Sequence, residues 1–235
     1  MMKPFTSVLL FIFDFFHKKK IINHLKKMNI FSINYFFDIG AHKGESIEFF
    51  SKNLDINKIF SFEASPDNFM NLKKKYGKNK NLVIENIALS SDISKKVFNQ
   101  CKESSSSTFS KINTKSNYLK RKMKYLSTSV NSEFFKKKII KTNTLDNYFY
   151  ENNIISVDLM KMDTEGHEFE ILKGLKKNIK NVKTIIFEHH YDNMLNKNYT
   201  FSNINFFLKE NSFQKVFKIK MPFRKSFEYI YVNKK

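Results

Sequence analysis

The sequence predicts a single α/β domain with an open, doubly wound and mostly parallel sheet. From residue 34 onward, strand patterns and helix patterns alternate, as they do in parallel sheets whose strands are joined by crossover helices. A glycine turn also links the first strand of this series to its first helix, which is how such proteins bring backbone N–H groups to a ligand. With 235 residues, the chain has room for one sizeable core, which we assign to 31–235.

The first elements of the series are short apolar runs separated by amphipathic segments. The run that begins at Ile33 is rich in aromatic residues and predicts a buried strand. Pro66 stands near the first turn of a helix, where its missing N–H costs nothing. The expected strands are 35–38, 58–63 and 82–89, and the expected helices are 45–52 and 66–76.

A polar, serine-rich stretch then runs from residue 90 to about residue 131. Val97 and Phe98 interrupt it, and a helix is expected over 117–125. The serines at 104–107 predict a loop. Alternation resumes after this stretch. It gives strands at 138–142, 157–163 and 183–189, helices at 145–151, 168–178 and 201–211, and a closing antiparallel hairpin of 214–220 and 227–232.

The segment 1–30 differs from the rest and is predicted as a separate N-terminal amphipathic helical segment. Residues 8–16 are apolar apart from Asp14, and His17 and three lysines follow. This run is too short for a transmembrane helix, and it lacks the small-residue cleavage site of a signal peptide. We expect one or two helices that cover the sheet or a dimer partner. The alternative is an interfacial helix that makes peripheral contact with an anionic membrane.

The charge of +20 raises the question of a nucleic-acid partner. Nearly all of the positive charge is lysine, and Arg121 and Arg224 are the only arginines, whereas proteins that read bases favour arginine. We therefore do not expect nucleic acid as a partner, and an RNA methyltransferase that uses the basic surface remains the alternative. Cys101 is the only cysteine, which excludes an intrachain disulfide and fits a cytoplasmic location.

Three acidic residues, Asp38, Glu63 and Asp163, end three of the predicted strands. Ligands of doubly wound sheets bind outside the carboxyl ends of the strands, so these carboxylates should converge on one crevice. Asp38 begins the glycine turn, and Glu63 follows 25 residues later, close to the spacing at which an acidic residue accepts hydrogen bonds from ribose hydroxyls. The pair indicates an adenosine-containing ligand.

The glycine turn departs from the dinucleotide fingerprint. Its glycines, Gly40 and Gly44, are separated by three residues, and His42 stands where a middle glycine would let phosphate approach. This spacing argues against NAD or FAD and favours S-adenosylmethionine (SAM), which has no phosphate. The side chain of His42 either packs within the loop or contacts the ligand.

The residues 158–168 form the second dense motif. Period-two alternation places Lys161 and Asp163 on one face of a strand, where they would form a partly buried ion pair. This pair either fixes the strand end and caps the next helix or belongs to an active site. Glu165 and His167 follow directly, and Gly174 is expected to let the next helix end tightly.

The third cluster, Glu188 to His190, ends the next predicted strand. Glutamate and histidine together could act as a base or bind a metal. Neighbouring residues on a strand point opposite ways, so Glu188 and His190 share a face and His189 points elsewhere. We do not expect a metal site, because no spacing in the sequence supplies further ligands.

Together, these residues resemble the FkbM-type SAM-dependent methyltransferases over roughly 36–190. The matching segments are 37–41 with Gly44, 62–66, 87–90, the serines before Phe109, 144–146, 161–168 leading into 172–174, and 185–188. The segment from Lys161 is the specific one. His42 stands where the family commonly has asparagine, and Ala64 where it has proline.

The resemblance implies a class I methyltransferase (Rossmann-like) fold, with seven strands and an antiparallel C-terminal strand. It implies O-methylation of a hydroxyl on a small-molecule or glycan acceptor, namely a sugar, glycolipid or secondary metabolite. By this analogy Asp38, Gly40 and Gly44 hold the methionine end of SAM, Glu63 holds the ribose, and Ala88 and its neighbours line the adenine pocket. Ala41, His42 and Ala64 are also expected to bind the cofactor. Asp163, Glu165 and Glu188 would lie near the methyl group and the acceptor. We expect Asp163 as the general base, with His167 or His190 second.

Overall fold

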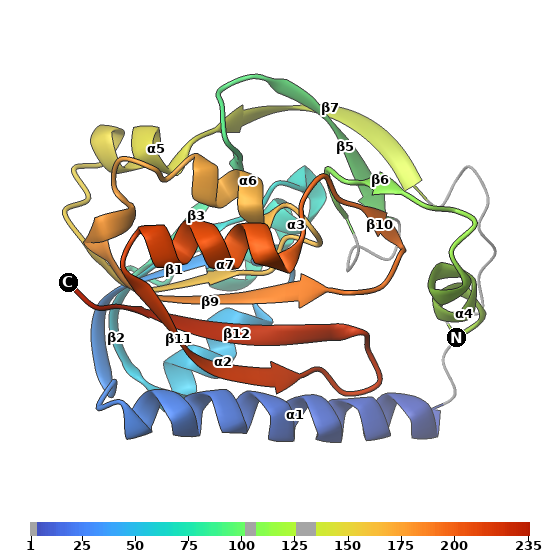
Figure 1. The fold of residues 1–235 in the computed structure, drawn as a ribbon, viewed down its shortest axis with the longest axis horizontal. Helices are drawn as coiled ribbons and strands as arrows, with labels where there is room; N and C mark the ends of the chain where they lie inside the picture. The colour runs from blue at the N-terminus through green and yellow to red at the C-terminus, as the bar shows by residue number, and fades with distance from the viewer. Residues whose placement is uncertain (1–3, 102–106, 126–134) are drawn as a thin grey trace.

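The computed structural model describes residues 4–101, 107–125 and 135–235. Its centre is a seven-stranded sheet of order β11-β12-β9-β8-β1-β2-β3 (Figure 1). The strands are β1 Ser32–Ile39, β2 Asp55–Phe62, β3 Leu82–Glu85, β8 Val157–Met162, β9 Val182–His190, β11 Phe213–Lys220 and β12 Ser226–Asn233. β1, β2, β3, β8 and β9 run parallel, and β12 is antiparallel to both of its neighbours. The predicted fold class and the predicted C-terminal hairpin are confirmed.

Helices cover both faces of this sheet, as a doubly wound fold requires. One face packs against α1 Pro4–Lys27, α2 Glu45–Asn53 and α3 Pro66–Tyr76, and the other against α5 Leu145–Glu151, α6 Glu168–Lys173 and α7 Phe201–Glu210. The period of two in β1 explains the division, because Phe36 points into the first core and Phe37 into the second. Both side chains are fully buried.

Two smaller sheets form an arch over one side of the molecule (Figure 1). The first contains β4 Ala88–Leu89, β5 Lys95–Cys101 and β7 Phe135–Asn143, and the second contains β6 Lys111–Ile112 and β10 Leu195–Asn196. The helix expected over 117–125 is α4 Asn117–Tyr125. The serines at 104–106 lie outside the described residues.

Two of the predicted strands were wrong in extent or place. The expected strand 82–89 is divided, since β3 pairs with β2 while β4 pairs with β7. Asn86 lies at the break, where its side-chain amide donates a 2.8 Å hydrogen bond to the Glu63 carbonyl. The expected strand 138–142 is the longer β7, which belongs to the arch rather than to the central sheet.

The helix expected over 168–178 is also shorter, because α6 ends at Lys173. A Cβ atom added to Gly174 would lie 2.0 Å from the carbonyl oxygen of Ser90. Only glycine lets the backbone after β4 approach the end of α6 this closely. The tight helix end that was predicted at Gly174 is therefore confirmed. A 3₁₀ turn, η1 Ile179–Asn181, then leads into β9.

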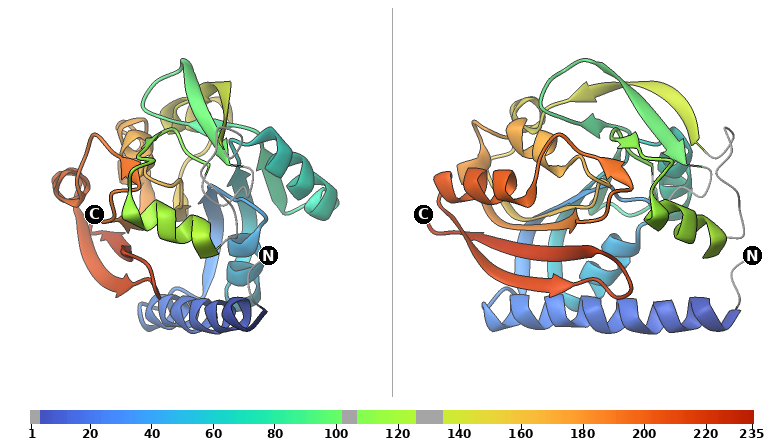
Figure 2. Two further views of the ribbon diagram at one scale, coloured as in Figure 1. Left: turned by 90° about the vertical axis from the view of Figure 1, so that its right-hand side faces the viewer. Right: turned by 45° about the vertical axis from the view of Figure 1, so that its right-hand side comes forward.

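The N-terminal segment forms one helix, α1, which runs along one side of the molecule beside the β11–β12 hairpin (Figures 1 and 2). Ile21, Ile22 and Leu25 are buried in the core that α1 shares with α2 and α3. Among the described residues, no helix is both long and apolar enough to cross a membrane.

Candidate active site

A cleft of about 1140 Å³ opens at the carboxyl ends of the central strands. Its walls come from the ends of β1, β2, β8 and β9, from α1 and α4, and from the turn between β11 and β12. Glu63 and Asp163 line the cleft, as the sequence predicted. Asp38 lies fully buried behind the lining, where burial raises its pKa to about 6 although Lys161 opposes the shift.

The glycine turn after β1 is built around one close approach. Gly40 has a φ of 87°, and a Cβ atom there would lie 2.1 Å from the carbonyl oxygen of Asp163 on the neighbouring strand. The Asp163 N–H in turn donates to the Ile39 carbonyl at 2.9 Å. Gly40 therefore locks the ends of β1 and β8 together. Gly44 lies further on, at the start of α2, and packs against Tyr76.

Glu63 fixes the conformation of this turn. Its Oε2 accepts the His42 N–H at 2.7 Å, and its Oε1 accepts the Ser65 N–H at 2.8 Å. Burial raises the pKa of Glu63, and these two hydrogen bonds oppose the rise. The His42 side chain contacts Glu45 at 3.1 Å between Nδ1 and Oε1, so it packs within the loop while it also borders the cleft. Three small side chains, Ala41, Ala64 and Ala88, also line the cleft.

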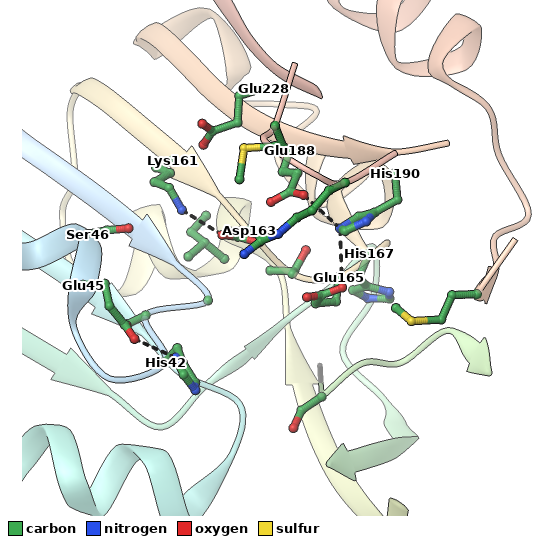
Figure 3. Close-up of a pocket in the computed structure, with 18 of the residues that line it drawn as sticks. His42, Glu45, Ser46, Lys161, Asp163, Glu165, His167, Glu188, His190 and Glu228 are labelled. Carbon is green, nitrogen blue, oxygen red and sulfur yellow. Dashed lines mark hydrogen bonds and ion pairs between the residues drawn. The ribbon is translucent and has the colours of Figure 1, made fainter. Parts of the chain in front are cut away.

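The predicted ion pair at the end of β8 is present. Lys161 Nζ lies 3.2 Å from Asp163 Oδ2 (Figure 3). Burial would raise the pKa of Asp163, but Lys161 outweighs it and holds the pKa below its ordinary value. The pKa of Lys161 is raised, since Asp163 and Asp38 overcome the effect of burial. Asp163 is therefore a carboxylate that stays ionised and a weak base.

His190 stands in a ring of carboxylates on the opposite wall. Its Nε2 lies 3.4 Å from Glu165 Oε2 and 3.5 Å from Glu188 Oε1, and its Nδ1 lies 3.5 Å from Asp192 Oδ2. Burial would lower the pKa of His190, but Glu165, Asp192 and Glu188 raise it to about 10. The imidazole is thus protonated at neutral pH and cannot accept a proton there.

Burial raises the pKa of Glu188, whereas burial opposes the raised pKa of His190. Burial and the nearby charge of Asp163 raise the pKa of Glu188 to about 7, although His190 opposes them. Its Oε1 is buried and forms no hydrogen bond with any described residue. A carboxyl group that lines the cleft with a pKa near neutrality is suited to take a proton from a ligand there.

The loop 163–168 is held by hydrogen bonds to the distant Thr108 and by hydrogen bonds within the loop to Glu168. Glu165 has a φ of 50°, a conformation rare for a residue with a side chain, and its carbonyl accepts a 2.6 Å hydrogen bond from Thr108 Oγ1. Glu168 Oε1 accepts the N–H groups of Thr164 and Gly166 at 3.0 and 3.1 Å. The strained loop holds the Glu165 carboxylate beside His190.

Two further histidines of the predicted motifs, His167 and His189, contact other parts of the fold. His167 lines the cleft, but its Nε2 contacts Ser90 Oγ at 3.0 Å and its ring packs 4.8 Å from Phe109. Burial lowers the pKa of His167 to about 4. His189 points to the other face of β9, where its ring contacts Tyr191, so the predicted division between His189 and its neighbours is confirmed. Among the described residues, no cluster of histidine, cysteine and acidic side chains could hold a metal ion.

The sequence matches the model of the methyltransferase FkbM domain over residues 38–215, which is most of the chain. The chain belongs to this family. The match begins at Asp38 and includes the carboxyl ends of β1, β2, β8 and β9, so the resemblance that the sequence motifs indicated is confirmed. FkbM methyltransferases use SAM as their cofactor. No curated protein matches the sequence.

Solved structures share the fold of this FkbM domain at low sequence identity. M. capricolum TrmK, solved with S-adenosyl-homocysteine, is 12% identical with a TM-score of 0.50, covering 91% of this chain and 68% of its own. Magnesium protoporphyrin IX methyltransferase from Synechocystis PCC 6803, solved with SAM, is 9% identical with a TM-score of 0.52, covering 92% and 78%. An FkbM methyltransferase from Methylobacillus flagellatus KT is 14% identical with a TM-score of 0.49, covering 86% of this chain and 44% of its own. The TrmK and protoporphyrin methyltransferase structures confirm the class I methyltransferase fold.

Sequence reasoning missed several residues of the FkbM cleft. Arg224, from the β11–β12 turn, lines it together with Asp14 from α1, and Arg224 Nη2 lies 3.8 Å from Asp14 Oδ2. Burial would lower the pKa of Arg224, but Glu188 and Asp14 raise it. The sequence contains one signal for this residue, namely the rarity of arginine in a lysine-rich chain. Both arginines, Arg121 and Arg224, line the cleft.

Proposed function

We propose that the chain is a SAM-dependent O-methyltransferase whose acceptor is a hydroxyl group of a sugar, glycolipid or secondary metabolite. One observation carries the proposal. Glu188 lies in the cleft with a pKa near neutrality and a buried oxygen that no described residue hydrogen-bonds. Oxygen methylation benefits from a group that removes the hydroxyl proton, and Glu188 has the pKa that this role needs at neutral pH.

The residues of the glycine turn fit SAM. We assign the methionine end to the turn of Asp38, Gly40, Ala41, His42 and Gly44, the ribose to Glu63 and Ala64, and the adenine to the wall that includes Ala88. The Glu63 carboxylate accepts two backbone N–H groups and retains lone pairs that face the cleft. Asp38 Oδ1 is buried without a hydrogen-bond partner among the described residues, so this oxygen can accept a hydrogen bond from a ligand held by the turn.

When bound, SAM supplies a methyl group that its sulfonium has already activated. The chain must then align the acceptor oxygen and remove its proton. We assign the proton removal to Glu188 in place of Asp163, because Lys161 keeps Asp163 ionised and weakly basic. His190 stays protonated and favours the ionised form of Glu188, and His167 is turned toward Ser90. Glu165 holds His190 in place.

The acidic lining disfavours the alternative of an RNA acceptor. Eight acidic side chains, Asp163, Glu165, Glu188 and Asp192 among them, border the cleft against five lysines and arginines, so a polyanion entering it would meet net repulsion. The basic charge of the chain would favour RNA binding, and this alternative is therefore included in the test.

The test is an acceptor screen with the full chain and SAM labelled in the methyl group. Sugars, glycolipids, hydroxylated metabolites and total RNA are offered in parallel, with Glu188→Gln and the exposed Glu210→Gln as the paired variants. We expect label in a stable ether of a hydroxylated acceptor, reduced about 100-fold or more in Glu188→Gln and unchanged in Glu210→Gln. Label in RNA, or on nitrogen or carbon of the product, would contradict the proposal.

A further inference from the structure

Four exposed phenylalanines form an aromatic patch beside the mouth of the cleft. The patch consists of Phe13, Phe15 and Phe16 of α1, with exposed fractions of 40%, 49% and 55%, and of Phe223 in the β11–β12 turn, with 66%. The Phe13 and Phe223 rings meet edge to face at 5.0 Å between centroids, and the Phe15 and Phe16 rings lie 5.9 Å apart. The contact between Phe13 and Phe223 joins α1 to the β11–β12 turn, and these two elements lie side by side although they are far apart in the sequence (Figures 1 and 2).

The patch is held in place by contacts below it. On the inner side of α1, the buried His17 contacts Glu228 of β12 at 2.5 Å. Asp14 pairs with Arg224 in the turn that carries Phe223. The exposed rings therefore stand on a backbone that is fixed to the sheet on two sides.

A basic border adjoins the patch. It consists of Lys18, Lys19 and Lys20 on α1 and Lys225 in the turn. Lys19 follows Phe15 by four residues and Lys20 follows Phe16 by four, so the Phe15 and Phe16 rings each have an exposed lysine one helical turn away on the same face. Aromatic rings bordered by lysines on one face of a helix are typical of helices that lie in the interface of an anionic bilayer.

We propose that the aromatic patch and its basic border dock on an anionic phospholipid membrane, with α1 lying in the plane of the interface. Charge favours lipid over a second copy of the chain. A symmetric contact through the patch would bring the same lysines of two copies together, in a protein that already carries a charge of +20. An anionic lipid surface instead attracts each of these lysines.

Docking in this way sets the orientation of the cleft. Asp14, Lys18 and Phe223 belong to the patch region and also line the cleft, so the membrane would border its mouth. If the proposed function holds, this orientation points to an acceptor that is the hydroxylated headgroup of a lipid-linked molecule. This inference about the acceptor rests on the proposed function. The docking itself does not depend on methyl transfer and is tested without it.

The experiment is co-sedimentation of the full chain with vesicles of phosphatidylcholine alone or mixed with phosphatidylglycerol. We expect binding to the anionic vesicles that weakens with salt. The double variant Phe15→Ser/Phe16→Ser should weaken it about 10-fold or more, as should Lys19→Glu/Lys20→Glu. The matched controls are Phe206→Ser on α7, where the ring is 65% exposed, and Lys176→Glu/Lys177→Glu after α6; both should bind as wild type.

Equal binding by the patch variants and their controls would overturn the proposal, as would an absence of binding to anionic vesicles. Dimers that the Phe15→Ser/Phe16→Ser change dissociates, without vesicle binding, would assign the patch to a second copy and also overturn it. Glu188→Gln should sediment with the vesicles like wild type. Failure of docking and failure of the proposed function are therefore separate results.

Discussion

At the scale of single residues, the surroundings of two cleft carboxylates are the reason for proposing Glu188 as the base, where the sequence predicted Asp163. The sequence placed Asp163 and Glu188 at adjacent strand ends, and the structure brings both to the cleft. It could not show which is the better base, because that depends on burial and on partners from other strands. Lys161 holds the Asp163 pKa down, whereas Glu188 is buried beside Asp163 with only His190 and Arg224 to offset it.

The first prediction concerns the pH dependence of turnover. A base must be ionised to act, so the wild-type rate should rise with pH and reach half of its plateau near pH 7, the pKa of Glu188. Glu188→Gln should lower kcat about 100- to 1000-fold and remove this rise, while SAM binding stays within about 2-fold of wild type. The measurement is kcat from pH 5 to pH 9 on the acceptor found in the screen. An unchanged profile in Glu188→Gln would move the base elsewhere.

The second prediction concerns the stability cost of the same carboxyl. Because the folded state raises its pKa from 4.5 to about 7, the folded chain binds more protons than the unfolded chain between these pH values. Wild type should therefore lose stability relative to Glu188→Gln as pH rises through this window, by about 1–3 kcal/mol. Urea unfolding of both proteins at pH 5 and pH 8 measures the difference. Wild-type stability that stays constant or rises relative to Glu188→Gln between pH 5 and pH 8 would contradict the raised pKa.

At the scale of elements, local sequence patterns located the strands and helices but could not assign strands to sheets. The apolar run over 82–89 fits one strand by composition, yet β3 and β4 pair with different partners. Asn86 lies at the break and donates to the Glu63 carbonyl, 23 residues away, a contact that the local sequence pattern does not indicate. Gly174 was easier to interpret, since glycine at a helix end is a local signal.

The third prediction tests the close approach at the end of α6. Gly174→Ala would place a methyl group 2.0 Å from the Ser90 carbonyl oxygen, so the backbone of β4 or α6 must move. We expect a loss of about 2–4 kcal/mol in the free energy of unfolding. Chemical denaturation of the variant measures it. Ser202→Ala on the exposed face of α7 is the control and should change stability by less than about 0.5 kcal/mol. A stable Gly174→Ala would mean that glycine is not required at this position.

At the scale of the whole molecule, the cleft is completed by parts that lie far apart in the sequence. The alternation of strands and helices predicted the central sheet and the edge at which ligands bind. It did not predict that α1 and the β11–β12 turn form one wall of the cleft. That wall depends on the contact between His17 and Glu228, which are 211 residues apart, and sequence periodicity carries no information at such a separation.

The fourth prediction is that α1 belongs to the core of the methyltransferase fold. Leu25 is fully buried between α1 and the sheet, so Leu25→Ala should lower the free energy of unfolding by about 2–5 kcal/mol. Phe16→Ala, on the exposed face of the same helix, should change it by less than about 0.5 kcal/mol. Thermal or urea unfolding of the full chain compares the two. Equal effects would mean that the packing of α1 adds no stability.

The most direct test of the site as a whole is a calorimetric titration of SAM into the full chain and into Glu63→Gln. Glutamine keeps only one of the two acceptor oxygens that hold the glycine turn and face the cleft. We predict one SAM site per wild-type chain and a Kd about 10- to 100-fold weaker in Glu63→Gln, with Glu210→Gln equal to wild type. Wild-type protein that binds no SAM, or a Glu63→Gln variant that binds it as tightly as wild type, would contradict the placement of the cofactor in this cleft.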